Sequence, residues 1–205
     1  MGIIKYLEVE DIMTPKVLVF AGSTRKGSLH RQLAVAAADD LRARGLDVHL
    51  ADLRDYPMPL YDGDLETESG VPENARAFRK LLERHDVFVI ASPEYNGSFP
   101  ALLKNVIDWT SRPVPGERPA AVFRGKTAAL LSASPGPGGG SRGLRHLREL
   151  LQMVGVEVLP VDVTIPRALS AFDADGRLIR PEDIAAIERI GQTIVSSAER
   201  APAAA

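Results

Sequence analysis

The sequence predicts an α/β fold in which five parallel strands form one doubly wound sheet with the strand order 2-1-3-4-5. Three observations predict it. Short apolar runs alternate with longer segments whose apolar residues recur at helical spacing. The run 86–92 is apolar almost without interruption, which is typical of a strand covered on both faces of a parallel sheet. Loops rich in glycine, proline and polar residues follow the first, third and fourth runs.

The expected elements follow one another in regular alternation. The predicted strands are 17–21, 46–51, 86–92, 126–133 and 156–163. The predicted helices are 28–44, 73–84, one that begins near 99–100, 141–154 and 181–197. Gly45 is placed to end the first helix, because glycine readily adopts the left-handed conformation found there. The long stretch 52–72 and the proline-rich stretch 111–123 are predicted to be irregular, and 172–176 is predicted to be a turn.

Composition limits the classes of protein that fit. The chain has 205 residues, of which 45% are hydrophobic and 25% charged, which suits one domain with a core of its own. A formal net charge of −2 argues against a general nucleic-acid role. The absence of cysteine excludes disulfides, thiolate metal sites and a cysteine nucleophile. No apolar run approaches transmembrane length, so we expect a soluble cytoplasmic protein without a membrane partner.

Three segments are expected along the chain. Residues 1–15 form an N-terminal arm, whose apolar residues suit a docking segment and a frayed end equally well. Its acidic residues distinguish it from a signal peptide. Residues 16–200 form the single domain, and 201–205 form a disposable tail.

The loop after the first strand has the features of a phosphate site. It leads from Gly22 into a helix that has Ser28 near its N-terminus, where free backbone N–H groups and the helix dipole favour an anion. Arg25 adds a cationic fork, and Ser23 adds a hydroxyl. The loop matches neither the P-loop nor the dinucleotide fingerprint. An ordinary strand-to-helix turn is the alternative interpretation.

The other two loops suit a flat heteroaromatic ring. Strands one, three and four are neighbours in the predicted order, so one ligand at their carboxyl ends reaches all three loops. A ring such as isoalloxazine needs N–H and C=O groups along its rim, which 94–97 can supply on one side and 134–140 on the other. Phosphate at one end and a ring at the other favour a mononucleotide, FMN, over a dinucleotide.

Three motifs occur in order along the chain: Gly22-Ser23-x-Arg25-x-x-Ser28, Pro93-Glu94-Tyr95-Asn96 and Leu103-Lys104-Asn105-x-x-Asp108-Trp109. Together they resemble the NAD(P)H-dependent FMN reductase family, which has the flavodoxin-like fold and includes quinone, chromate and azo-dye reductases. The resemblance covers 16–197. It implies that the cofactor-binding residues are Ser23, Thr24, Arg25, Lys26, Gly27, Ser28, Leu29, His30, Pro93, Glu94, Tyr95, Asn96, Gly97, Ser134 and Gly136.

The resemblance also implies an activity. It is that of an FMN-dependent oxidoreductase, in which hydride passes from NADPH or NADH via FMN to a quinone, a flavin, an azo dye or a metal oxyanion. No catalytic side chain and no metal are expected, because the cofactor carries the chemistry. A homodimer or homotetramer is implied as well. The alternatives are a flavodoxin-like electron carrier without turnover of its own, and a flavin-free enzyme that binds another phosphorylated ligand.

Several residues are open to a structural interpretation. His30 stands where the family often has Asn, and we expect it to make phosphate affinity depend on pH. Residues 104–109 are expected to brace a loop or an interface. The basic residues of 142–148 are expected to form a solvated face or a subunit contact in preference to a nicotinamide-phosphate site. His49 and His85 are expected to be structural.

Overall fold

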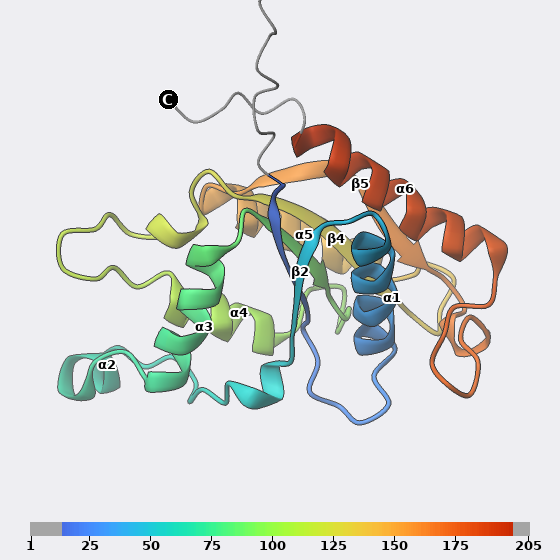
Figure 1. The fold of residues 1–205 in the computed structure, drawn as a ribbon. Helices are drawn as coiled ribbons and strands as arrows, with labels where there is room; N and C mark the ends of the chain where they lie inside the picture. The colour runs from blue at the N-terminus through green and yellow to red at the C-terminus, as the bar shows by residue number, and fades with distance from the viewer. Residues whose placement is uncertain (1–13, 199–205) are drawn as a thin grey trace, which may run out of the picture.

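The computed structural model describes residues 14–198, so the expected tail and nearly all of the expected N-terminal arm lie outside the described residues. Helices and strands alternate along this part of the chain (Figure 1). The strands are β1 (Lys16–Ala21), β2 (Asp47–Ala51), β3 (Val87–Ala91), β4 (Thr127–Ala133) and β5 (Glu157–Ile165). The helices are α1 (Leu29–Ala43), α2 (Gly63–Ser69), α3 (Glu73–Arg84), α4 (Ala101–Thr110), α5 (Ser141–Met153) and α6 (Pro181–Ala198).

The five strands form one parallel sheet in the order β2-β1-β3-β4-β5, which confirms the predicted fold class and strand order. In the register, Val17 of β1 faces Val48 of β2 on one side and Val87 of β3 on the other. Every residue of β3 is buried, as its unbroken apolar sequence predicts. From β1 the chain moves to β2 on one side, and from β2 it returns to β3 on the other side of β1. The ends of β1 and β3 therefore form the topological switch point.

Two layers of helices cover the sheet. Helices α1 and α6 pack on one face, and α3, α4 and α5 pack on the other (Figure 1). Apolar residues of these five helices recur at three- and four-residue spacing and reach the sheet from one side. Gly45 has φ +82° and follows α1 directly, which confirms its predicted place at the end of that helix. No helix within 14–198 is both long enough and apolar enough to cross a membrane.

The prediction that 52–72 is irregular was wrong in part. This stretch contains a 3₁₀ turn, Leu53–Asp55, and the short helix α2. Helix α2 begins after Asp62, whose carboxylate accepts the backbone N–H of Asp64 at 2.8 Å. None of its residues is buried, so the apolar periodicity that reveals the other helices is absent from its sequence.

The edge strand β5 is longer than predicted and irregular. The register between β4 and β5 shifts between Ala128 and Leu130, opposite the segment that contains Pro160. A proline lacks the N–H that a central strand requires, so its place on an edge strand is expected. The strand continues to Ile165, whose carbonyl accepts the N–H of Ser134 at 3.0 Å. Strand β5 therefore anchors the loop that follows β4.

Candidate functional site

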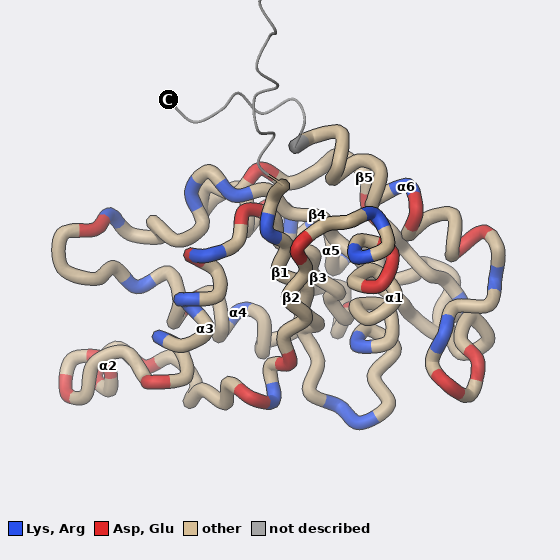
Figure 2. The backbone as a smooth tube through the Cα atoms, viewed as in Figure 1, with Lys and Arg blue, Asp and Glu red and all other residues tan. Residues whose placement is uncertain are grey.

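The loop between β1 and α1 presents unpaired donors. Ser28 is the N-cap of α1, and its Oγ accepts the N–H of Arg31 at 3.4 Å. Thr24 to Gly27 are exposed, and within 14–198 no protein acceptor pairs with the backbone N–H groups of Thr24, Lys26 or Gly27. Figure 2 shows Lys and Arg at the tip of this loop. The side chains of Arg25 and Lys26 form no ion pair with the described residues. This combination suits an anion at the start of α1.

His30 is held as a neutral ring inside the site. It is 8% exposed, and its Nε2 accepts the backbone N–H of Ala133 at 3.2 Å. Burial, and then the nearby Arg25, lower the pKa of His30 to about 4. Since Nε2 is an acceptor, the ring proton lies on Nδ1, which leaves that N–H as a donor. The free ring therefore becomes charged only in acidic solution, and the expected pH dependence of phosphate affinity stays a prediction.

Two buried serines connect the ends of β3 and β4. Ser132 Oγ donates to the carbonyl of Ser92 at 2.8 Å and lies 3.5 Å from Nε2 of His30. The start of α1 is therefore tied through His30 to β4, and β4 through Ser132 to β3. Sequence analysis missed both serines, because a polar residue at the end of a strand carries no signal of its partner. These contacts confirm that the loops after β1, β3 and β4 meet at one edge of the sheet.

The loop after β3 forms a tight turn. Tyr95 and Ser98 exchange two backbone hydrogen bonds, of 2.9 and 3.1 Å. Asn96 and Gly97 lie between them with φ values of +53° and +80°, the pattern of a type I′ turn, for which Asn-Gly is the preferred sequence. The turn leaves the Tyr95 side chain 56% exposed. Within 14–198, the backbone groups of Asn96 and Gly97 have no backbone partner, and a rigid turn of this kind suits the rim of a ring.

Glu94 has a structural partner of its own. Its Oε2 accepts the N–H of Gly143, in the first turn of α5, at 3.0 Å. Gly143 packs so closely that a Cβ there would lie 3.2 Å from the carbonyl oxygen of Ser98. The Glu94 carboxylate therefore fixes the turn to α5. Pro93 itself is buried at the end of β3.

The loop after β4 is anchored on both sides. Ser134 Oγ accepts the N–H of Gly136 at 3.1 Å, and the Ser134 carbonyl accepts the N–H of Ala168 at 3.0 Å. The loop returns so close to β4 that a Cβ on Gly140 would lie 1.9 Å from Ser132 Oγ. Gly140 also has φ +90°, so only glycine fits there without strain. Ser134 and Gly136 are half-buried and lie across the sheet edge from the first loop.

Asn105 and Trp109 of α4 brace a loop other than the one that precedes their helix. Asn105 Oδ1 accepts the N–H of Tyr61 at 2.7 Å, and Asn105 Nδ2 and Trp109 Nε1 each donate to the carbonyl of Pro59 at 2.8 Å. Lys104 and Asp108 form an ion pair within the helix. Asn105 and Trp109 thus secure the segment 59–61, which lies outside the three loops.

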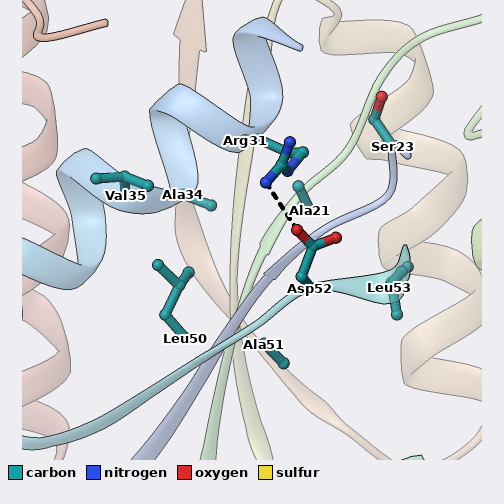
Figure 3. Close-up of a pocket in the computed structure, with 9 residues that line it drawn as sticks. All are labelled: Ala21, Ser23, Arg31, Ala34, Val35, Leu50, Ala51, Asp52 and Leu53. Atoms are coloured by element: carbon teal, nitrogen blue, oxygen red, sulfur yellow. Dashed lines mark hydrogen bonds and ion pairs between the residues drawn. The ribbon is translucent and has the colours of Figure 1, made fainter. Parts of the chain in front are cut away.

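A small cleft lies beside the first loop, between α1 and the end of β2 (Figure 3). Arg31 projects from α1 and bonds Asp52 Oδ2 at 2.7 Å, while Ser23 lies nearby. Arg54 first, and then Arg31, hold the pKa of Asp52 below its usual value. The cleft measures about 130 Å³, below the roughly 300–1,000 Å³ of usual ligand pockets. It is too small for a flavin ring, and its ion pair steadies the start of α1.

Residues 15–170 match the model of a family described as NADPH-dependent FMN reductase. The chain belongs to this family. An NAD(P)H-dependent FMN reductase of Pseudomonas aeruginosa is 41% identical over 80% of this chain and 84% of its own length. An NAD(P)H:quinone oxidoreductase of Solanum tuberosum is 42% identical over 82% of this chain and 84% of its own length. The flavoenzyme FerB of Paracoccus denitrificans, an NAD(P)H:(acceptor) oxidoreductase, covers 91% of this chain and 98% of its own with a TM-score of 0.75 and 26% identity.

As a member of the NADPH-dependent FMN reductase family, the chain is an oxidoreductase with FMN as cofactor and NAD(P)H as co-substrate. The residues present fit FMN. Donors without protein acceptors stand at the start of α1, where a phosphate is expected, and an exposed backbone turn stands beyond it at 95–98. Both lie at the carboxyl ends of neighbouring strands, where open α/β sheets bind their ligands.

Proposed function

We propose that this chain is an NAD(P)H:quinone reductase. The observation that carries the proposal is the anion-suited start of α1, tied through His30 and Ser132 to the loops that suit a flavin ring. The relative from Solanum tuberosum, named as a quinone oxidoreductase and 42% identical, supports a quinone as the acceptor. Free flavins, azo dyes and metal oxyanions are the competing acceptors.

Each loop has a proposed role toward FMN. Residues 23–30 bind the phosphate through backbone N–H groups, the two serine hydroxyls and the Arg25 guanidinium. Residues 93–97 line the ribityl and isoalloxazine side, mainly through backbone groups. Ser134 and Gly136 line the opposite rim. When bound, FMN supplies a redox centre that takes a hydride from NAD(P)H and passes two electrons to an acceptor.

No protein acid, base or nucleophile is assigned to the reaction. The protein orients the cofactor through the anchored loops, and Tyr95 stands exposed beside the proposed ring site. We propose that the protein is a cytoplasmic homodimer or homotetramer in which Tyr95 contacts the ring or a neighbouring subunit. Sedimentation of the purified chain tests the assembly directly.

The activity is tested by steady-state kinetics with FMN-loaded protein, NADPH and a benzoquinone under anaerobic conditions. We expect quinol to form in equal amount to the NADPH consumed. Turnover of ferricyanide or a metal oxyanion without turnover of any quinone would contradict the assignment of the acceptor. Binding of FMN without NAD(P)H oxidation by any acceptor would favour the electron carrier instead.

A further inference from the structure

Helix α5 begins with two arginines whose charge has no partner. Arg142 and Arg145 are exposed, and within 14–198 neither forms an ion pair or a side-chain hydrogen bond. Arg148, on the same helix, differs from them, because it bonds Asp162 at 2.5 Å and the carbonyl of Val158 at 3.1 Å. The basic segment predicted at 142–148 is therefore divided into a paired part and an unpaired part.

The unpaired arginines have one acid on their helix, the exposed Glu149 four residues after Arg145, and none nearer the start of the helix. They are three residues apart, so their like charges lie on neighbouring positions of the helix surface and repel. They also lie at the N-terminal end, where the helix dipole disfavours cations, and the first turn contains no acid. The Glu94 carboxylate nearby is already bonded to the N–H of Gly143. A bound anion would relieve all of this at once.

The same turn of α5 is fixed against the proposed ring site. Gly143 contacts Glu94 and Ser98, and His146 Nδ1 lies 3.2 Å from Ser98 Oγ. The FMN phosphate is assigned to the start of α1, so Arg142 and Arg145 form a second cationic group at the same edge of the sheet. NADPH, which must approach this edge to react, differs from NADH by a 2′-phosphate that carries about two negative charges at neutral pH.

We propose that Arg142 and Arg145 bind the 2′-phosphate of NADPH and thereby select NADPH over NADH. This inference rests on the proposed oxidoreductase function and adds the choice of co-substrate to it. Two guanidinium groups offer planar, bidentate donors that match phosphate oxygens. Arg142 and Arg145 are specificity residues that touch the co-substrate, and the contacts of Glu94 and His146 hold their helix beside the ring site.

The test is the double variant Arg142→Gln/Arg145→Gln, with Arg189→Gln as a matched control. Arg189 is also exposed and unpaired within the described residues, but it lies on α6, on the other face of the sheet. We expect the ratio of kcat/KM for NADPH to that for NADH to fall by about tenfold or more, the loss typical of one or more charge-assisted hydrogen bonds. The control keeps the wild-type ratio.

A binding measurement accompanies the kinetics. Calorimetry of the FMN-loaded protein with 2′,5′-ADP and with 5′-AMP compares ligands that differ in the 2′-phosphate. We expect the double variant to lose affinity for 2′,5′-ADP and to keep its affinity for 5′-AMP. If the double variant keeps the wild-type ratio of kcat/KM for NADPH to that for NADH, the inference is overturned, whether or not its oligomeric state has changed. A wild-type protein that oxidises neither nucleotide overturns the proposed function itself.

Discussion

At the scale of single residues, we propose that Arg25 is the side chain on which cofactor retention depends most. It is exposed at the first loop and has no acidic partner in residues 14–198. If Arg25 binds the phosphate as proposed, Arg25→Ala removes a charge-assisted hydrogen bond worth about 1.5–3 kcal/mol, so the Kd for FMN should rise by about tenfold or more. Quenching of FMN fluorescence measures this Kd. Turnover at saturating FMN should change little, because Arg25 is not assigned to the ring.

Arg84→Ala is the control for that experiment. Arg84 is exposed in the last turn of α3, at the edge of the sheet opposite the site, and has no ion pair within the described part of the chain. Its removal should leave FMN affinity unchanged. Equal losses in the two variants would show that net charge, rather than the first loop, governs retention, and the phosphate assignment would then be wrong.

His30 gives the fold a pH dependence with a definite sign. Its pKa is about 4 in the folded protein and has the ordinary value of 6.5 in the unfolded chain. The unfolded chain therefore binds more protons between pH 4 and pH 6.5. The free energy of unfolding is therefore unaffected by the titration of His30 above pH 6.5, and it decreases as pH falls from 6.5 toward 4. The shift corresponds to about 3 kcal/mol at most. His30→Gln keeps an acceptor for Ala133 but cannot titrate.

Urea unfolding at several pH values tests this prediction. Between neutral pH and about pH 5, wild type should lose more unfolding free energy than His30→Gln does, since only wild type takes up the extra proton. The far-ultraviolet circular dichroism signal reports the transition. Parallel pH profiles for the two proteins would contradict the neutral, buried state of His30.

The sequence predicts Arg25 and Ser28 as phosphate-binding residues from their place in a strand–loop–helix motif, which is local information. It could not show that His30 accepts a hydrogen bond from Ala133, because that partner lies 103 residues away. It likewise gave no sign that Glu94 caps α5, a contact across 49 residues. Side-chain partners of this kind depend on how the loops pack against one another. Patterns in a single sequence do not show that packing.

At the scale of elements, the connection from β4 to α5 depends on one glycine. Gly140→Ala places a methyl group against Ser132 Oγ and forces a non-glycine residue to φ +90°. Backbone strain and overpacking each cost about 1–3 kcal/mol, so unfolding free energy should fall by at least about 2 kcal/mol. FMN affinity should fall too, because Ser134 and Gly136 belong to the same loop.

Gly138→Ala is a matched control, since a Cβ at Gly138 meets nothing within 4 Å and its φ is not in the left-handed region. Chemical denaturation of both variants gives the comparison. A Gly140→Ala protein as stable as Gly138→Ala would show that the loop does not pass against β4 as described.

The elements that sequence analysis predicted well are those with apolar faces. Strand β3 and helix α5 bury one continuous set of apolar residues each, and that pattern is visible in the sequence. Helix α2 has no buried residue. It depends on the Asp62 cap and on Glu66, which Arg112 bonds at 2.7 Å from a distant part of the chain. Such a helix was not predictable from periodicity.

At the scale of the whole molecule, the strand order was predictable because right-handed crossovers and alternating elements leave few arrangements. The order places the three unusual loops together, and the contacts of His30 and Ser132 confirm that they meet. The bulge between β4 and β5 was not predictable, since Pro160 lies inside an apolar run that otherwise extends a regular strand.

A cofactor bound at this edge should stabilise the entire fold. FMN at a concentration of 100 times Kd contributes about 2.7 kcal/mol to unfolding free energy, which raises Tm by about 5–10 °C in a domain of this size. Riboflavin, which lacks the phosphate, should raise Tm much less at the same concentration. Differential scanning fluorimetry at one protein concentration compares them. Equal shifts would mean that the first loop does not bind phosphate.

The most direct test of the central claim is an anaerobic absorption titration of the FMN-loaded protein. On addition of one equivalent of NADPH per FMN, the flavin bands should bleach, and they should return in full when one equivalent of a quinone per FMN is added. Flavin bands that persist in excess NADPH and excess NADH, on a protein shown to hold FMN, would contradict the assignment as an NAD(P)H-dependent flavin reductase.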